Sequence, residues 1–421
     1  PQYLADLSKA VLGSMQAVDP DAIWVLQGWA FHFGPEFWGP EQIEAHLGAV
    51  DNEHMIILDL WTETNPVWSG TNSFYGKPFL WCELLNFGGN LVMTGRMNTV
   101  MNGPYETAEN SSMAGIGVTA EGLFTNELMF DMLFDHAWAK GPVPILDWVY
   151  SYIHARYGQQ NHSAQKAWKV FSETAFDHPP VGLSKARIVK RPSLGLYGIN
   201  YSHCDFLPGW GHLIDAGDEL KDVGTYRFDL VDTTRQAMSN LFEDWFSSLR
   251  LAGIRKDVCN VELLRPRMLD LLADMDEVLA THQAYLYGRW LQDAEQHANN
   301  QAEWENLKLN AKYIVTLWGP QGQLSDYSAR MWSGLLRDYY LPRWEIAFDQ
   351  LLDDIKDGKP FDEELFVERS MSHDYSFIEE EKVYRTEPYG DPLEVSQRMH
   401  KKYISAAQAA CPGEQDWLTF Q

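Results

Sequence analysis

The feature that most constrains the fold is an alternation of short apolar runs with helical patterns in the first 142 residues. Continuous apolar runs of this length are typical of strands buried on both faces of a sheet. These runs occupy residues 22–29, 55–61, 78–90 and 114–120. Apolar residues at helical spacing occupy residues 3–15, 40–50, 90–100 and 126–140. Strand and helix patterns that alternate at intervals of about 30 residues indicate β/α units around a parallel sheet.

Four β/α units make half of an eightfold barrel, not a whole one. A doubly wound open sheet usually carries a glycine-rich phosphate loop after its first strand, and the sequence has none there. The remaining alternative is a small independent α/β domain, and the opening of the chain on a helix, as if in mid-fold, argues against it. We therefore predict that residues 1–142 form half of a (β/α)8 TIM-type barrel.

From residue 143 onward the strand signal disappears and long helical patterns follow. They occupy residues 145–157, 163–173, 225–251, 265–296, 302–317, 328–356 and 393–409. A chain of 421 residues is also too long for one ordinary core. The predicted fold class is therefore α/β plus all-α, with a large α-helical domain over residues 143–421. The acidic run at 379–381 is interpreted as a solvated surface.

The charge balance and the apolar content limit the partners. The chain has 33 Lys plus Arg against 59 Asp plus Glu, a formal net charge of −26. Such a surface repels phosphate backbones, so we expect no nucleic-acid partner. No uncharged apolar run approaches ~18 residues, so we expect no membrane span. Aromatic residues reach 13%, including 17 Trp, and suit stacking on the apolar faces of sugar rings as well as core packing.

The cysteines and glycosylation sequons leave the compartment open. Four cysteines stand in no metal-ligand spacing and form no disulfide framework, although one incidental bridge is left open: Cys82, Cys204, Cys259 and Cys411. Three sequons permit glycosylation on a secretory route: Asn110, Asn161 and Asn200. The chain begins without Met and without a charged-then-apolar leader, so no targeting signal is visible in it.

Carboxylates among aromatic residues are the chemistry that the sequence offers. Zinc-protease motifs, cysteine-pair metal sites, phosphate loops and nucleophile-elbow serines do not occur in it. Glycoside hydrolysis needs two carboxyl groups whose pKa values are set apart by burial and neighbouring charge. The candidate carboxylates at predicted strand ends are Asp59, Glu63, Glu83 and Glu121. Because this chemistry needs neither a metal nor a cofactor, we expect none.

Among these acids, Glu121 best fits a catalytic position. It lies in a glycine-flanked turn between a strand and a helix, where barrel enzymes place reactive groups. An acid in the first turn of a helix, near the positive end of its dipole, gives the same local pattern. Glu63 is interpreted as a solvated loop acid rather than a sugar ligand, and Asp59 as satisfying the backbone or neighbouring side chains. Glu127 is interpreted as capping or bracing a helix.

The segment around Trp318 differs from the rest of the helical domain. A helical pattern stops at a Trp-Gly-Pro turn, and the loop after it contains Leu324, Asp326 and Tyr327. An exposed Trp in such a turn is an unusual use of a large apolar side chain. Trp318 either packs on its own helix or covers a sugar pocket on the barrel, and the sequence leaves both readings open.

Several long segments carry a family resemblance, in one order along the chain. They are WVLQGWAFHFGPEFWGPEQIEAHLGAV (24–50), LDLWTETNPVW (58–68), PFLWCELLNFGGN (78–90), NSSMAGIGVTAEGLFTNELMFDM (110–132), RPSL (191–194) and TLWGP (316–320) with the following Asp326-Tyr327. Together they resemble the α-N-acetylglucosaminidase family, a lysosomal enzyme class that acts on heparan sulfate, and its bacterial relatives. The resemblance runs from the first residue to Trp344 and more loosely beyond.

The resemblance implies a retaining glycosidase that uses two glutamates on a barrel. The family nucleophile lies in an Ala/Pro-Glu-Gly turn, which in this chain is Ala120-Glu121-Gly122, so Glu121 inherits that role. The implied sugar-binding residues are Trp29, Leu60, Leu84, Phe87, Trp318, Leu324 and Tyr327. The helical domain would thus contribute to the sugar pocket. Thr119-Ala120 departs from relatives with a proline before the glutamate, which affects the stiffness of the turn.

The general acid of the family lies in an Asn-Glu pair shortly before the segment that matches Pro1. The chain is therefore expected to need its own N-terminal portion for activity. The implied activity is exo-acting release of terminal α-linked N-acetylglucosamine from glycans such as heparan sulfate, in a lysosomal or secreted protein. The alternatives are a non-catalytic carbohydrate-binding or scaffold fragment, and a hydrolase of another α-linked hexose. The natural aglycone and a homo-oligomeric state are left open.

Overall fold

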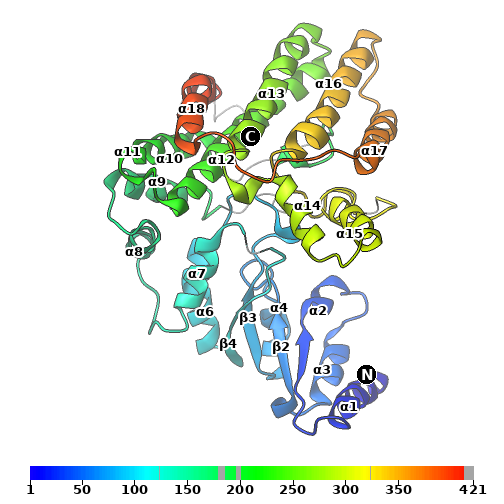
Figure 1. Cartoon of the computed structure of the whole chain (residues 1–421). Helices are drawn as coiled ribbons and strands as arrows, with labels where there is room; N and C mark the ends of the chain where they lie inside the picture. The colour runs from blue at the N-terminus through cyan, green and yellow to red at the C-terminus, as the bar shows by residue number, and fades with distance from the viewer. Residues whose placement is uncertain (123, 179–184, 196–200, 323, 412–421) are drawn as a thin grey trace. The chain divides into compact units, whose positions relative to one another are not determined.

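The computed structural model describes residues 1–122, 124–178, 185–195, 201–322 and 324–411 (Figure 1). The chain divides into two compact units. The first unit contains Pro1–Asn86 and Gly95–Trp148, and the second contains Phe87–Thr94 and Val149–Gln421. The short segment Phe87–Thr94 is thus separated from its chain neighbours and belongs to the helical unit.

The first unit is built on a four-stranded parallel sheet in the order β1-β2-β3-β4 (Figure 1). Its strands are β1 (Trp24–Gln27), β2 (Met55–Asp59), β3 (Phe79–Glu83) and β4 (Met113–Val118). Because consecutive strands are parallel neighbours, every connection crosses over, and the carboxyl ends of all four strands lie at one edge. The predicted parallel β/α organisation is confirmed, and this edge is where the candidate site must be sought.

Helices and turns connect these strands. They are α1 (Gln2–Gln16), α2 (Trp29–Phe33), α3 (Pro40–Gly48), η1 (Asn52–His54), α4 (Val67–Gly70), α5 (Asn72–Tyr75), α6 (Met97–Glu109) and α7 (Glu127–Asp135). α5 is a left-handed turn, because all four of its residues have positive φ. The core under the sheet joins Leu12 of α1, Ile43 and Leu47 of α3, and strand residues such as Ile57 and Phe79, all at most 8% exposed. Each buried side chain of this kind contributes about 1.5–3 kcal/mol of transfer free energy.

Two predictions for residues 1–142 are wrong. Residues 90–96 are not helical, and α6 begins only at Met97. In the residues before it, the Asn90 side chain donates to the carbonyl of Phe87, and the Met93 N–H donates to Gln236 Oε1 at 3.0 Å, so these bonds replace a helical ladder. The first strand is also not buried on both faces, because β1 alternates and its Val25 is 56% exposed.

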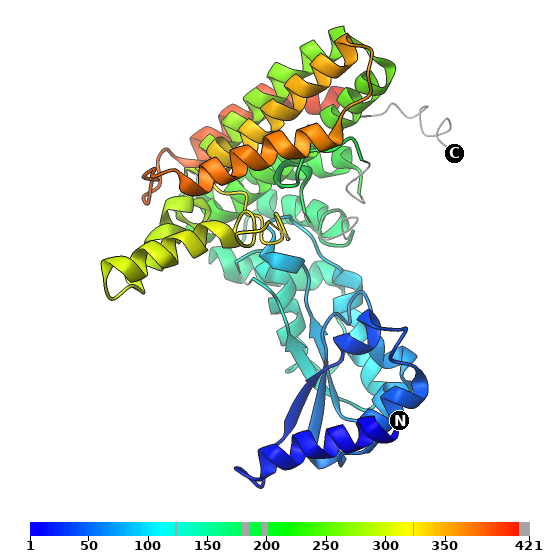
Figure 2. The same cartoon turned by 90° about the vertical axis from the view of Figure 1, so that its right-hand side faces the viewer.

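The second unit is helical, as predicted. Its elements are α8 (Ile145–Tyr157, which begins in the first unit), α9 (His162–Glu173), η3 (Arg187–Val189), α10 (His203–Asp215), α11 (Gly217–Leu220), α12 (Gly224–Arg255), α13 (Val258–Leu279), η4 (Gln283–Tyr285), α14 (Tyr287–Gln296), α15 (Gln301–Ile314), the π-turn η5 (Leu336–Tyr340), α16 (Leu341–Lys356), α17 (Glu363–Glu379) and α18 (Pro392–Ala409), with η2 (Phe87–Gly89) from the inserted segment. The long helices α13, α16 and α17 lie side by side (Figure 2). None of the described helices is long and apolar enough to cross a membrane.

Helix α12 forms the centre of this unit. It packs against α10, α13 and α18, and its Leu230, Met238 and Phe242 are fully buried. Buried polar groups on it are paired: Asp229 accepts from Arg156 at 2.7 and 2.8 Å and from the Tyr157 hydroxyl at 2.9 Å. Such pairing is what makes charged side chains tolerable inside a helical core.

Three predictions in the helical region differ from the structure. The pattern at 265–296 is two helices, because the chain turns through η4 between α13 and α14. Residues 328–334 are not helical, since Gly334 has φ of 94° and its N–H donates to Asp276 Oδ1 at 2.8 Å. α10 and α17 were not expected, and α10 contains Pro208 and two glycines that conceal its pattern. The acidic surface at 379–381 is confirmed, with Glu381 side chain 77% exposed.

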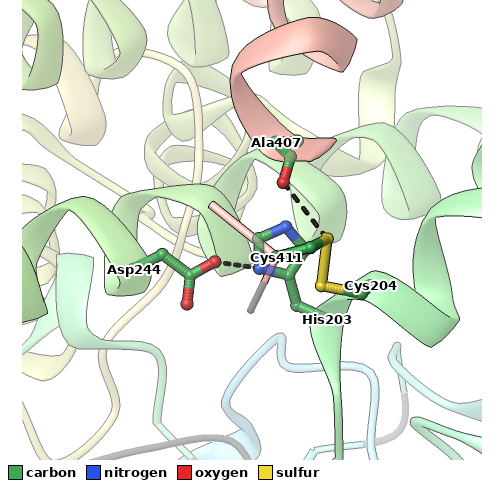
Figure 3. Close-up of a disulfide and its surroundings, with 5 residues drawn as sticks. All are labelled: His203, Cys204, Asp244, Ala407 and Cys411. Carbon is green, nitrogen blue, oxygen red and sulfur yellow. Dashed lines mark hydrogen bonds and ion pairs between the residues drawn. A yellow bond between two sulfur atoms is a disulfide. The ribbon is translucent and has the colours of Figure 1, made fainter. Parts of the chain in front are cut away.

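A disulfide joins Cys204 at the start of α10 to Cys411 just after α18 (Figure 3). The sequence left one such bridge open. Next to it, His203 Nδ1 pairs with a carboxylate oxygen of Asp244. A cross-link across 207 residues stabilises the fold by about 5 kcal/mol in the chain-entropy account, because it restricts the unfolded chain. Cys82 and Cys259 carry free thiols.

Candidate active site

Four of the predicted site residues follow the carboxyl ends of the four strands. Trp29 begins α2 after β1, Leu60 directly follows β2, Leu84 directly follows β3, and Glu121 follows β4 in a bend. Since these strands are consecutive neighbours in a parallel sheet, the four residues lie along one edge of the first unit.

Thr119 fixes the turn that carries Glu121. Its backbone N–H donates to the carbonyl of Glu83 at 2.9 Å, which extends the β3–β4 ladder by one bond. Its hydroxyl donates to the carbonyl of Leu60 at 2.6 Å. The turn is therefore tied to the ends of two neighbouring strands, while Glu121 itself is exposed. An exposed carboxylate on an anchored backbone is what a nucleophile at a strand end requires.

The alternative reading of Glu121 as a helix-start acid is wrong. α7 begins at Glu127, and Asn126 is its N-cap residue, so Glu121 lies outside the first turn of that helix. Glu127 occupies the first turn, as expected of it.

Two tryptophans lie together at this edge. The Trp29 ring, half-buried, has its centroid 5.9 Å from that of Trp61, and it also contacts His32 at 4.8 Å. Gly28, directly before Trp29, donates its N–H to the carbonyl of Leu58 at 2.9 Å and so fixes the start of α2 against β2. Trp61 was not among the predicted site residues, although its place immediately after Leu60 could have indicated it.

Three carboxyl groups at the ends of β2 and β3 are buried. Asp59 accepts the N–H of Val67 at 3.3 Å and of Trp68 at 3.0 Å, which confirms its interpretation as satisfying the backbone. Glu63 is only 4% exposed, so its interpretation as a solvated acid is wrong. Glu83 is fully buried. The carboxylate of Glu63 is buried because backbone N–H groups just after β3 donate hydrogen bonds to it.

Burial raises the pKa of each of these groups. The pKa of Asp59 rises to about 6, although the N–H groups of Trp68 and Val67 oppose the shift. The pKa of Glu63 rises to about 7 through burial, opposed by backbone N–H donors and more weakly by Arg96. Burial, and then the Glu63 charge, hold the pKa of Glu83 well above its usual range.

The second unit brings the other four predicted residues into one loop region. Trp318, 41% exposed, has its ring centroid 5.0 Å from that of Tyr327. Leu324 is 54% exposed, and its carbonyl accepts the N–H of Tyr327 at 2.9 Å. Asn90 donates to the carbonyls of Phe87 and, at 3.4 Å, of Tyr327. The ring pair of Trp318 and Tyr327 therefore lies next to the segment Phe87–Thr94.

Buried Asp326 anchors this loop. Its carboxylate accepts two hydrogen bonds from Arg343, at 2.9 and 2.8 Å. Its backbone, at φ of 63°, donates to the carbonyl of Thr316 at 2.7 Å. Gly88 approaches the same loop so closely that a Cβ on it would lie 2.1 Å from the Tyr327 carbonyl, so no larger residue fits there. Arg343 was missed because nothing in the helical pattern of α16 indicates its partner.

A hollow of about 300 Å³ lies elsewhere in the second unit, against α15 and the end of α17. Its cations are already paired: Lys308 with Glu381, and Lys312 with the carbonyls of Ile378 and Glu380. It contains none of the predicted site residues. Within the described ranges, no group of three His, Cys, Asp or Glu side chains is arranged to hold a metal ion.

Comparison with solved structures places this architecture among glycoside hydrolases. A family 89 glycoside hydrolase from Clostridium perfringens, solved as a variant with two glutamates replaced by glutamine in complex with its substrate GlcNAc-α-1,4-galactose, superimposes with a TM-score of 0.84 at 25% identity. The match covers 96% of this chain and 47% of that one. The same enzyme in complex with PUGNAc gives a TM-score of 0.84 at 26% identity, over 95% and 46% of the two chains.

The family models identify the class more closely. Residues 1–140 match the TIM-barrel domain of α-N-acetylglucosaminidase, and residues 148–402 match the C-terminal domain of that enzyme. The chain therefore belongs to the α-N-acetylglucosaminidase family. Human α-N-acetylglucosaminidase is 36% identical over 414 residues, which are 96% of this chain and 55% of the human protein. The chain thus spans about half the length of the relatives it matches.

Proposed function

We propose that the protein is a retaining exo-α-N-acetylglucosaminidase in which Glu121 is the nucleophile. The observation that carries this proposal is the exposed carboxylate of Glu121 on a turn that Thr119 ties to the ends of β2 and β3. Family membership supports the reaction class and the sugar. The general acid is an Asn-Glu glutamate in the N-terminal portion of the complete protein, outside this chain.

In this mechanism the Glu121 carboxylate attacks the anomeric carbon while the general acid protonates the leaving glycosidic oxygen. The resulting glycosyl-enzyme ester is then hydrolysed by water, and the same acid, now a carboxylate, removes the proton from that water. Two displacements retain the configuration, and the two carboxyl groups need a separation of about 5 Å. Trapping of a substrate by a relative with two glutamates replaced supports a mechanism of two glutamates.

We infer that the sugar is bound by aromatic and aliphatic side chains of both units. The proposed set is Trp29, Leu60, Leu84, Phe87, Trp318, Leu324 and Tyr327, with Trp61 added because its ring lies against Trp29. Rings of this kind stack on the apolar face of a pyranose, while the reacting carboxylates approach its anomeric carbon. The helical domain (residues 143–421) is thus proposed to contribute to binding as well as the barrel half (residues 1–142).

The family assignment further suggests heparan sulfate among the substrates and a lysosomal or secreted location. Glycosylation on such a route would favour Asn110, which is exposed at the end of α6. Asn161 is 8% exposed and caps α9 by accepting the Ala164 N–H at 2.8 Å, so its side chain is poorly available. Asn200 lies outside the described residues.

The test is Glu121→Gln in the complete protein, measured on an aryl α-N-acetylglucosaminide. We expect kcat to fall at least about a thousandfold, because the covalent intermediate cannot form. Glu109→Gln, an exposed acid at the end of α6, is the matched control and should retain full activity. The product of the parent enzyme, followed by NMR, should first appear as the α anomer.

Normal turnover by Glu121→Gln, or first release of the β anomer, would contradict the proposed role. Calorimetry with N-acetylglucosamine separates the non-catalytic alternative. A complete protein that binds this sugar but turns over no α-N-acetylglucosaminide would be a binding or scaffold protein. Turnover of an α-linked hexose without the acetamido group at equal kcat/KM would instead favour the alternative hydrolase.

A further inference from the structure

Two buried glutamates of the first unit have no place in the proposed displacement. Glu63 lies in the loop after β2 and is 4% exposed, and Glu83 is the last residue of β3 and has no exposed surface. Both stand beside Leu84, which we propose as a sugar contact. Buried carboxyl groups are costly unless they are bonded or protonated, so each needs a physical reason.

Glu63 is bonded to the backbone after β3. Its Oε1 accepts the N–H of Leu84 at 3.2 Å and the N–H of Leu85 at 2.8 Å. Leu85 has φ of 69°, a left-handed conformation that costs a leucine about 1–2 kcal/mol. The carboxylate therefore stabilises a turn that the local sequence disfavours, and this turn sets where Leu84 stands.

Glu83 is in the opposite situation. Both of its carboxyl oxygens are buried, and within the part of the chain that the structure describes neither has a hydrogen-bond partner. An ionised carboxylate in such a place would be uncompensated, and Glu63 is close enough for its charge to act on Glu83. A proton on Glu83 removes that cost and supplies a donor in the neighbourhood of the Glu63 carboxylate.

The other titratable groups around the pair favour this distribution of one proton. On β2, Asp59 is bonded to N–H groups of the following loop. On β3, burial first and then the charges of Asp59 and Glu63 raise the pKa of the Cys82 thiol to about 12, so it stays neutral. At the start of α6, Arg96 favours the ionised form of Glu63. Of the two carboxyl groups, Glu63 therefore loses its proton first, and Glu83 keeps its proton to higher pH.

We propose that Glu63 is a positioning residue that fixes the turn of Leu84 and Leu85, and that Glu83, buried beside the same turn without a partner among the described residues, keeps Glu63 in place by staying neutral. Sugar binding is then tight only where Glu83 retains that proton, since a second negative charge beside Glu63 repels it from the turn. The predicted effect on sugar binding rests on the proposed function, whereas the predicted effect on the turn does not.

The test uses three variants of the complete protein, with Glu53→Gln, an exposed acid just before β2, as the control. Glu63→Leu removes the acceptor at similar size. Glu63→Gln keeps an acceptor oxygen for the turn, and its amide can donate to Glu83. Glu83→Gln keeps a neutral donor at every pH. Amide exchange of Leu84 and Leu85 reports the turn, and KM for an aryl α-N-acetylglucosaminide reports the sugar.

We expect exchange of both amides to be at least about tenfold faster in Glu63→Leu than in the control, with KM raised and kcat less affected. Glu63→Gln should retain the protection. In the parent protein, KM and the exchange of both amides, each corrected for the intrinsic rate of an unprotected amide at the same pH, should rise as Glu83 loses its proton with increasing pH, and Glu83→Gln should abolish that rise in both.

Unchanged exchange in Glu63→Leu would overturn the positioning role, and a parental pH dependence in Glu83→Gln would overturn the role of the neutral Glu83. If Glu63→Leu does not fold, Glu63→Gln decides: retained protection of Leu84 and Leu85 supports the acceptor role, and fast exchange of both amides contradicts it. An inactive parent protein would refute the proposed function, while the exchange data would still decide the role of Glu63.

Discussion

The two regions that carry the proposed sugar contacts are held by different chemistry. In the first unit, the turn at Leu85 is held by Glu63 through backbone N–H donors. In the second, the loop around Tyr327 is held by Asp326 in a bidentate pair with Arg343. Both contain a residue in the left-handed region, Leu85 at φ of 69° and Asp326 at 63°. A strained loop thus needs a buried acceptor in each case, but the second acceptor binds a guanidinium in a bidentate pair, whereas Arg96 acts on Glu63 more weakly than the backbone N–H donors do.

The two regions differ in how strongly they respond to protonation. Neutral N–H donors stabilise a carboxylate less than a guanidinium does, so burial dominates at Glu63 and raises its pKa to about 7. The Asp326–Arg343 pair instead depends on both partners being present, because losing either leaves a buried charge. We therefore expect mutation to damage the second region more, and pH to affect the first region more.

The largest effect is expected for Arg343→Met. This change leaves Asp326 buried without its cation, and it removes the weaker of two cations from Asp374, which Arg343 approaches at 3.5 Å and which keeps Arg191 at 2.6 Å. We expect the free energy of unfolding to fall by about 3–5 kcal/mol, measured by chemical denaturation. The control is Arg265→Met, which breaks exposed pairs with Glu345 and Asp349 and should cost less than about 1 kcal/mol. If Arg343→Met and Arg265→Met lowered the free energy of unfolding equally, the buried pair would be no more important than the surface pairs.

A matched pair of amide variants separates the two anchors directly. Asp326→Asn keeps the shape but leaves the guanidinium of Arg343 without its full counter-charge, and should cost about 2 kcal/mol or more. Glu63→Gln keeps an acceptor for the N–H of Leu85 and should cost less than about 1 kcal/mol. Denaturation of both variants in one buffer measures the difference. If Glu63→Gln is the more damaging change, the two anchors have been assigned the wrong chemistry.

The pH dependence has a defined sign in the first region. The pKa of Glu83 is raised well above its usual value of 4.5, so the folded protein binds this proton more tightly than the unfolded chain. Its contribution to stability is present in full below about pH 4.5 and is lost as pH rises through the folded pKa. Glu83→Gln removes that loss, so the Tm of the variant minus that of the parent should increase as pH rises above about 4.5. A constant difference would show that Glu83 carries no raised pKa.

The smallest effect on stability is expected at the exposed end of the second region. Trp318 is 41% exposed and contacts Tyr327, so Trp318→Ala should lower the free energy of unfolding by only about 1 kcal/mol. Its KM for an α-N-acetylglucosaminide should nevertheless rise several-fold if the ring contacts the sugar. Trp138→Ala, which removes a ring that is 90% exposed, is the control and should change neither quantity. An unchanged KM in Trp318→Ala would limit that ring to packing.

Sequence patterns predicted those parts of the fold that depend on local periodicity. The four strands were found because their apolar runs are short and continuous, and the family resemblance then gave Glu121 and the pocket residues. The periodicity could not show the break between α13 and α14, which depends on the Tyr285 and Leu286 backbone pairing with residue Ser333 far along the chain. The same holds for the disulfide, because Cys204 and Cys411 are neighbours only after α10 and α18 have packed.

The burial of Glu63 could not be predicted for a related reason. In sequence it is an acid in a polar Thr-Glu-Thr loop, which is the pattern of a solvated turn. Its partners, the N–H groups of Leu84 and Leu85, belong to the next strand end, and their availability follows from the left-handed conformation of Leu85. Arg343 was overlooked in the same way, since its partner lies 17 residues earlier in a loop.

The most direct test of the account is to trap the intermediate in the complete protein with a fluorinated α-N-acetylglucosaminyl donor and to map the modified peptide by mass spectrometry. We expect one covalent sugar, attached to the peptide that contains Glu121, with inactivation in step with labelling. A sugar found on another residue, such as Glu63 or Glu83, or inactivation without a covalent adduct would contradict the assignment of Glu121 as the nucleophile.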